Sequence, residues 1–190
     1  MPRHSNQDNG ASRGRVRWAR RLAAVLLVSV GALLLVFAQE WRGVEAILAS
    51  DAIQLVTGQT TQASPALHML ILYKNASVES IFVLTSECSV AYLLSALFIG
   101  SAPLMLLRQL SARRTAMAVA LTAAILMLVN VARLTAIAAT VSGMGIDPGL
   151  TIAHTYFGSL LTVVGTCAAG VAFAAVLVGR RRKSGRPAMA

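Results

Sequence analysis

The sequence predicts an all-α integral membrane protein with about four transmembrane helices and both termini in the cytoplasm. Hydrophobic residues make up 56% of the 190 residues, and the mean hydropathy of +0.69 is too high for an ordinary soluble domain. Four segments are long enough and apolar enough to cross a bilayer. Basic residues cluster directly outside these segments, as they do at the cytoplasmic ends of transmembrane helices.

The predicted elements follow from these apolar runs and their basic flanks. Placing both tails and the turn at residues 108–114 in the cytoplasm puts 14 of the 17 basic residues inside and six of the seven acidic residues outside. The predicted organisation is a basic tail (1–21), a first span (22–38), an outer segment (39–87), a three-helix core (88–178) with spans at about 90–107, 115–139 and 153–178, and a second basic tail (179–190).

The first span has an alternative interpretation. Basic residues, an apolar run and Val36-Phe37-Ala38 also resemble a secretory signal with a cleavage site, although an apolar run of 17 residues exceeds the usual 7–15. We expect the segment to be retained as an anchor. Cleavage would leave three spans and the same outer side.

The outer segment is predicted to contain an interfacial helix and a hairpin. Apolar residues recur at helical spacing in its first part, which indicates an amphipathic helix at the membrane surface. A polar turn is expected at Thr57–Ser64. Two apolar runs, Leu67–Tyr73 and Val78–Leu84, flank a short polar turn, which favours either a hairpin or extended chain lining a groove. The apolar residues of the predicted helix are Val44, Ile47, Leu48, Ala52, Leu55 and Val56.

The composition also bears on partners and cofactors. A formal net charge of +10 often indicates a nucleic-acid partner, but here the basic residues flank spans, so membrane lipids are expected instead. Two cysteines are too few for a disulfide framework. The sequence contains no metal-binding spacing and no nucleotide or phosphate motif. We therefore predict no metal, no cofactor and no nucleic-acid partner.

Three reactive side chains are predicted to lie in one layer at the outer membrane face. Measured from the cytoplasmic end of each span at about 1.5 Å per residue, Cys88 lies about 30 Å away, Arg133 about 26 Å and His154 about 38 Å. These heights all correspond to the outer boundary of the roughly 30 Å hydrocarbon core. A thiol, a fixed positive charge and an imidazole at one face suit cysteine-based acyl transfer.

Each of the three has a second interpretation. Cys88 at a helix N-terminus is expected to act as a nucleophile, because peptide dipoles favour the thiolate, but a lone membrane cysteine also serves as a small packing residue. Arg133 is expected to stabilise an oxyanion, with Asn130 one turn earlier as a second donor; alternatively it extends to the headgroups. His154 is the expected general base and acid, or a structural interfacial residue. Gly158 leaves room for a close backbone approach.

Cys88-Ser89 at the head of one span, Asn130-x-x-Arg133 in the next and His154-x-x-x-Gly158 opening the last resemble the exosortase/archaeosortase family. Its members are multi-span membrane cysteine transpeptidases that are analogous to sortases in chemistry but not in fold. The resemblance covers about residues 67–178. The chain departs from the family pattern at Val90, where members usually have Gly, and it has fewer spans than many members.

The resemblance and the chemistry together predict a cysteine transpeptidase of the plasma membrane with its active site on the extracytoplasmic side. Such an enzyme cleaves a C-terminal sorting signal, which carries its own hydrophobic helix, from secreted proteins. It transfers the new C-terminus to an amine or lipid acceptor, with Cys88 as nucleophile and no cofactor. Two alternatives stay open, a non-enzymatic assembly or scaffold subunit and a hydrolytic intramembrane cysteine protease with water as acceptor.

Overall fold

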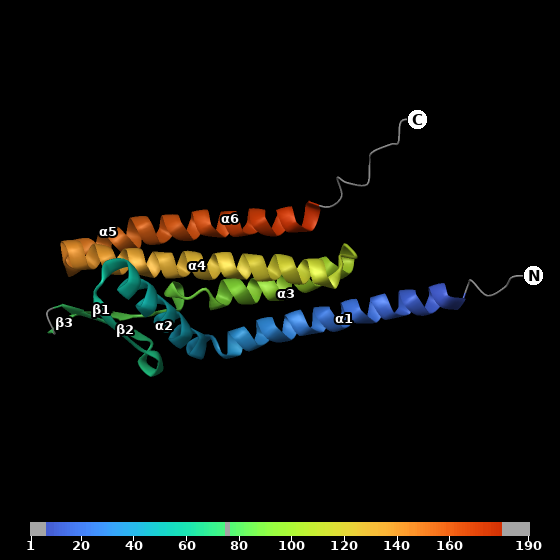
Figure 1. The fold of residues 1–190 in the computed structure, drawn as a ribbon, viewed down its shortest axis with the longest axis horizontal. Coiled ribbons are helices and arrows are strands. Elements are labelled where there is room, and N and C mark those ends of the chain that lie inside the picture. Colours follow the sequence, from blue (N-terminus) through green and yellow to red (C-terminus); the bar gives the residue numbers. More distant parts are fainter. Residues whose placement is uncertain (1–6, 75–76, 180–190) are drawn as a thin grey trace, which may run out of the picture.

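The computed structural model describes residues 7–74 and 77–179, so most of the C-terminal basic tail, the first six residues and the hairpin-turn residues Asn75 and Ala76 lie outside the described part. The described chain is mostly helical and carries one small sheet (Figure 1). Its elements are α1 (Gln7–Val36), α2 (Ala38–Thr57), β1 (Thr60–Ser64), β2 (Met69–Lys74), β3 (Ser77–Val83), α3 (Ala91–Leu107), α4 (Ala112–Met144), α5 (Ile146–Ile152) and α6 (Ser159–Val178).

Four long helices lie side by side in the order α1, α3, α4, α6 (Figure 1). The start of α1, the turn between α3 and α4 and the end of α6 lie at one end of this layer. Arginines gather at this end, where Arg17, Arg20 and Arg21 border a hollow beside Gln109. The sheet, α2 and α5 lie at the opposite end, which we call the sheet end.

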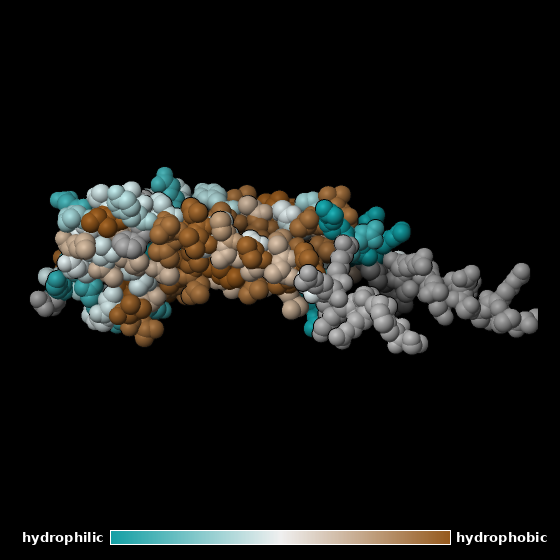
Figure 2. All heavy atoms as spheres, turned by 90° about the horizontal axis from the view of Figure 1, so that it is seen from above, coloured by the Kyte–Doolittle hydropathy of each residue, from teal (hydrophilic) through white to brown (hydrophobic). Residues whose placement is uncertain are grey.

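Three helices are long and apolar enough to cross a membrane, namely α4, α6 and the part of α1 from Arg17 to Val36. The helix α3 contains no charged residue but has only 17 residues. Hydrophobic residues cover the middle of the molecule in Figure 2, and hydrophilic residues gather towards its ends. A broad band of exposed apolar side chains is typical of a surface that faces lipid.

The boundaries of the helices differ from the sequence prediction most clearly at the start of α1 and at the start of the fourth predicted span. The helix α1 begins at Gln7, so residues 7–21 of the predicted tail continue the first helix. The fourth predicted span opens with a π-helical turn, Ala153–Gly158, before the regular helix α6 starts at Ser159.

The chain is mostly helical as predicted, but it is not all-α, because residues 60–64, 69–74 and 77–83 form a three-stranded antiparallel sheet of order β1-β2-β3. The two predicted apolar runs do form a hairpin, with Leu70 opposite Phe82. The expected polar turn at Thr57–Ser64 is instead largely strand β1, with Thr61 opposite Leu72. Polar side chains are tolerated there because β1 is an edge strand that uses main-chain hydrogen bonds to β2.

The helix α2 packs through a face other than its large apolar residues. Ala46, Ala49 and Ile53 are fully buried and form a core with the sheet and α4. The predicted apolar face is largely exposed, since Leu55 and Val56 are 87% and 70% exposed. A helix with one packed small-residue face and one exposed apolar face suits a position at the membrane surface.

The contact between α1 and α3 depends on a close approach at Gly31. The Ser95 hydroxyl donates a hydrogen bond to the Gly31 carbonyl at 2.7 Å. A Cβ atom at Gly31 would lie 2.6 Å from Ile99 Cγ1 and 3.0 Å from the Ser95 carbonyl oxygen. Small residues at such crossings let helix backbones approach in membrane proteins.

We expect Gly31→Leu to destabilise the protein by about 1–3 kcal/mol, because the larger side chain overpacks the α1–α3 contact. Thermal unfolding in detergent measures this effect. The matched control is Gly100→Leu on α3, where a Cβ atom has no neighbour within 4 Å. Equal stabilities of the two variants would contradict the close approach at Gly31.

Candidate active site

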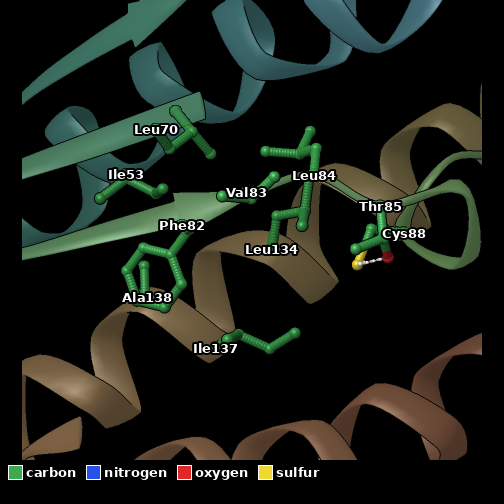
Figure 3. A pocket seen from close by; sticks show the side chains of 10 residues that line it. All are labelled: Ile53, Leu70, Phe82, Val83, Leu84, Thr85, Cys88, Leu134, Ile137 and Ala138. Atoms are coloured by element: carbon green, nitrogen blue, oxygen red, sulfur yellow. Dashed lines mark hydrogen bonds between the residues drawn. The ribbon is translucent and has the colours of Figure 1, made fainter. Parts of the chain in front are cut away.

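Cys88 lies in a 3₁₀ turn, Ser86–Cys88, that joins β3 to α3 at the sheet end of the molecule. Its amide donates to the Thr85 carbonyl at 3.1 Å, and the Thr85 hydroxyl donates to the Cys88 sulfur at 3.7 Å (Figure 3). The residue is half-buried and packs against the core that includes Leu134. The turn therefore holds the thiol in a defined position while leaving part of it accessible.

The expected position of Cys88 at a helix N-terminus is wrong in detail. The helix α3 begins three residues later, at Ala91, and its first amides already have acceptors. The Val90 amide donates to Glu45 Oε1 at 3.0 Å, and the Ala91 amide donates to the Ser89 hydroxyl at 3.2 Å. The side chains of Glu45 and Ser89 therefore cap the start of α3, and the two amides are not directed at the thiol.

Val90 fits the turn without strain. It has φ −85° and ψ 0°, a conformation on the negative side of φ that does not require glycine. The departure from the family's usual glycine therefore requires no unusual backbone conformation in this chain.

Glu45 is a site residue that the sequence analysis missed. Its side chain on α2 is fully buried, and Oε1 also accepts a hydrogen bond from the Ser89 hydroxyl at 3.2 Å. Burial raises its pKa, although the hydrogen bonds from Val90 and Ser89 act in the opposite direction. Glu45 thus joins α2 to the chain directly after Cys88. The helical pattern of large apolar residues in α2 does not include this face, so it gives no sign that Glu45, next to Ala46 on the small-residue face, is buried.

We expect Glu45→Gln to flatten the pH dependence of stability. Because the folded state raises the pKa of Glu45 above its ordinary value of 4.5, the folded protein binds this proton more tightly than the unfolded chain. The free energy of unfolding should therefore fall as the pH rises from about 4.5 through the raised pKa. Thermal unfolding over this pH range in detergent measures the slope.

The control for this prediction is Glu40→Gln, which changes an exposed acid on the same helix. This variant should keep the slope of the unmodified protein. A Glu45→Gln protein with an unchanged slope would show that another group causes the pH dependence.

Arg133 on α4 is buried between two segments that carry other candidate residues. It is only 9% exposed, and Nη1 donates to the Glu87 carbonyl, next to Cys88, at 3.3 Å. A Cβ atom at Gly158 would lie 3.3 Å from Arg133 Nε and 3.7 Å from Nη2. The guanidinium thus lies against the turn of Cys88 and against the end of the π-helical turn.

Asn130 lies one turn before Arg133 and is also buried. Both residues line a cavity of about 50 Å³ together with Ser89 and Thr162. Neither Asn130 Nδ2 nor Arg133 Nε donates to an acceptor within the described residues. Two unused buried donors in a space of this size can bind a small acceptor such as a water molecule or a carbonyl oxygen.

His154 lies in the π-helical turn Ala153–Gly158, which packs against α4. Its side chain is outside the described part of the structure. Turns of this kind are frequent at functional sites. The structure therefore brings the turn of Cys88, the Arg133 guanidinium and the turn of His154 together, with Arg133 between the other two.

The thiol and the guanidinium line different cavities. Cys88 borders a cavity of about 230 Å³ between α2, the sheet and α4, whereas Arg133 borders the smaller one between α3, α4 and α6. A carbonyl group attacked by Cys88 and bound by Arg133 would have to lie between them. Within the described residues, no group of three His, Cys, Asp or Glu side chains is arranged to hold a metal ion.

Comparisons with protein-family models, with curated proteins and with solved structures found no match to this chain.

Proposed function

We propose that the chain is a membrane-embedded cysteine transpeptidase of the exosortase/archaeosortase type. The observation that carries the proposal is the buried Arg133 guanidinium, which contacts both the turn of Cys88 and the turn of His154. A charged side chain inside an apolar helix is costly, and such residues normally serve a function or pair with a partner. Here described residues offer the guanidinium one carbonyl acceptor and leave its Nε without one.

The proposed topology has four spans, both termini in the cytoplasm and the sheet end outside the plasma membrane. The support comes from one end of the molecule, where the start of α1 and the α3–α4 turn carry arginines and the end of α6 lies beside them. The helix α3, at about 26 Å, is shorter than the roughly 30 Å core. Its neighbouring turn at Cys88 would therefore lie close to the outer boundary of the hydrocarbon region.

In the proposed mechanism, the Cys88 thiolate attacks a peptide carbonyl of the sorting signal at the outer face. The carbonyl carbon gains a bond to sulfur, and Arg133 stabilises the resulting oxyanion, assisted by Asn130. Collapse of this intermediate breaks the C–N bond while His154 protonates the leaving amine. The product is a thioester on Cys88 and a released C-terminal fragment.

The second half of the reaction transfers the acyl group. An acceptor amine or lipid hydroxyl loses its proton to His154 and attacks the thioester carbonyl, and the C–S bond breaks, so that the Cys88 thiolate and protonated His154 are regenerated. The proposed substrates are secreted proteins whose C-terminal helix docks against the layer of four helices, with membrane lipids around both. Water as acceptor would make the protein a hydrolase instead.

The product distinguishes these functions. Membranes containing the protein and a tagged substrate with a C-terminal hydrophobic helix should yield a tagged product whose new C-terminus carries the mass of an acceptor. A free carboxylate at the same position would identify a hydrolytic cysteine protease. Unprocessed substrate with both proteins intact, for every substrate tried, would favour the scaffold subunit.

A further inference from the structure

The cavity beside Cys88 is apolar except at the end where the thiol lies (Figure 3). Thr85 and Cys88 provide its polar and reactive groups, and Figure 3 shows them on the opposite side of the lining from Phe82 and Ala138. The apolar walls come from α2, both hairpin strands and α4, through Ile53, Leu70, Phe82, Val83, Leu134 and Ala138.

The size of the cavity matches one large side chain. Its volume is about 230 Å³. An apolar cavity of about 150 Å³ stays dry and binds benzene, whereas pockets for whole drug-sized ligands span about 300–1,000 Å³. The space therefore fits a group such as the side chain of leucine or phenylalanine, and its lining offers such a group few hydrogen-bond partners.

The strand that forms one wall also offers a place for extended peptide. Within the described residues β3 pairs with β2 alone, so its other edge is free. Extended peptides bind such edges through main-chain hydrogen bonds, and pockets for individual side chains supply the specificity. The strand β3 ends at Val83, a wall residue, and the chain continues directly to Thr85 and Cys88.

We infer that this cavity is the specificity subsite for one large apolar side chain of the substrate peptide, next to the bond that Cys88 cleaves. The inference rests on the proposed function, since it assigns the occupant to the substrate. Burial of the side chain positions the neighbouring carbonyl at the thiol. Substrates with leucine or phenylalanine at this position are preferred over those with alanine or a charged residue.

The cavity can be tested without any peptide substrate, through the reactivity of Cys88. In a Cys167→Ala background, the rates of disulfide formation at Cys88 are measured with methyl and with benzyl methanethiosulfonate. The rate ratio of the two reagents is compared with their ratio towards glutathione. The benzyl-to-methyl rate ratio should be about tenfold or more higher at Cys88 than at glutathione. An apolar pocket discriminates by such factors between groups that fill it and groups that do not.

Two variants fill the cavity and one serves as a matched control. Ala138→Leu adds volume to the α4 wall, and Val83→Phe adds it from an edge-strand position that is 55% exposed and tolerant of a larger side chain. Either variant should abolish the benzyl preference. Ile81→Phe changes an equally exposed residue of β3 that is not part of the lining, and it should keep the preference.

The outcomes separate the subsite from the proposed function. An absent benzyl preference, or a decyl reagent that reacts faster than the benzyl one, would overturn the subsite, the latter in favour of a lipid chain as occupant. Equal processing of substrates with leucine and alanine, all of it dependent on Cys88, would overturn the subsite and leave the transpeptidase standing. A benzyl preference without any Cys88-dependent processing would overturn the proposed function and the assignment of a substrate side chain to the cavity.

Discussion

Replacement of Cys88 by alanine is expected to abolish processing of the sorting signal, by a factor on the order of 10⁴ or more. The Cys88 sulfur is the proposed attacking atom, and the described residues of the turn offer no second nucleophile in its position. The rate of substrate cleavage, divided by the amount of folded protein, measures the effect. The residue is half-buried, and among the described side chains only the Thr85 hydroxyl donates a hydrogen bond to its sulfur, so removal of the thiol should disturb the fold little.

The matched control for this prediction is Cys167→Ala. Cys167 is exposed on α6 and lies outside the site. Its removal should leave cleavage unchanged. If Cys88→Ala cleaves the substrate at the normal rate, the thiol is not the nucleophile, and the scaffold interpretation gains support.

Replacement of Arg133 by alanine is expected to slow acyl transfer by about 100-fold or more, the usual effect of removing an oxyanion donor. It should also lower stability by about 1–3 kcal/mol, because the part-buried hydrogen bond from the charged guanidinium to the Glu87 carbonyl is lost. Arg133→Lys should recover little activity, since one ammonium group cannot contact Glu87 and Gly158 through the same planar fork. Single-turnover rates and thermal unfolding in detergent separate the two effects.

Arg114→Ala provides the control for Arg133. Arg114 Nε donates to the Val176 carbonyl at 2.7 Å near the opposite end of the same helix, so this arginine also joins α4 to another segment. Its loss should reduce stability while the rate per folded molecule stays the same. Equal loss of rate in both variants would mean that Arg133 acts only by holding the fold.

The sequence is informative where a property depends on composition and spacing along the chain. Apolar runs with basic flanks located the four long helices, although α1 begins well before its predicted span and regular α6 begins after its predicted start. Two apolar runs around a polar turn located the β2–β3 hairpin. Helical rise alone placed Cys88, Arg133 and His154 at similar heights. The structure agrees to the extent that Arg133 contacts the turns of both other residues.

The features that could not be predicted depend on contacts between distant segments. Glu45 meets Val90 across 45 positions of the chain, and no periodic pattern in α2 reveals that a carboxyl would be buried there. The strand β1 shows no apolar alternation in its sequence, because the inward positions of this edge strand are the small residues Thr61 and Ala63. The cavity beside Cys88 is likewise invisible in the sequence, because its walls come from α2, the hairpin and α4.

The most direct test of the central claim is to trap the acyl group on Cys88. Membranes containing the protein are incubated with a tagged substrate, the reaction is quenched in acid, and the covalent adduct is located by mass spectrometry. We expect a hydroxylamine-sensitive thioester on Cys88 that is absent in Cys88→Ala and that, in His154→Ala, forms slowly and is not passed on to an acceptor. Substrate cleavage that proceeds without any adduct, and equally well in Cys88→Ala, would contradict the account.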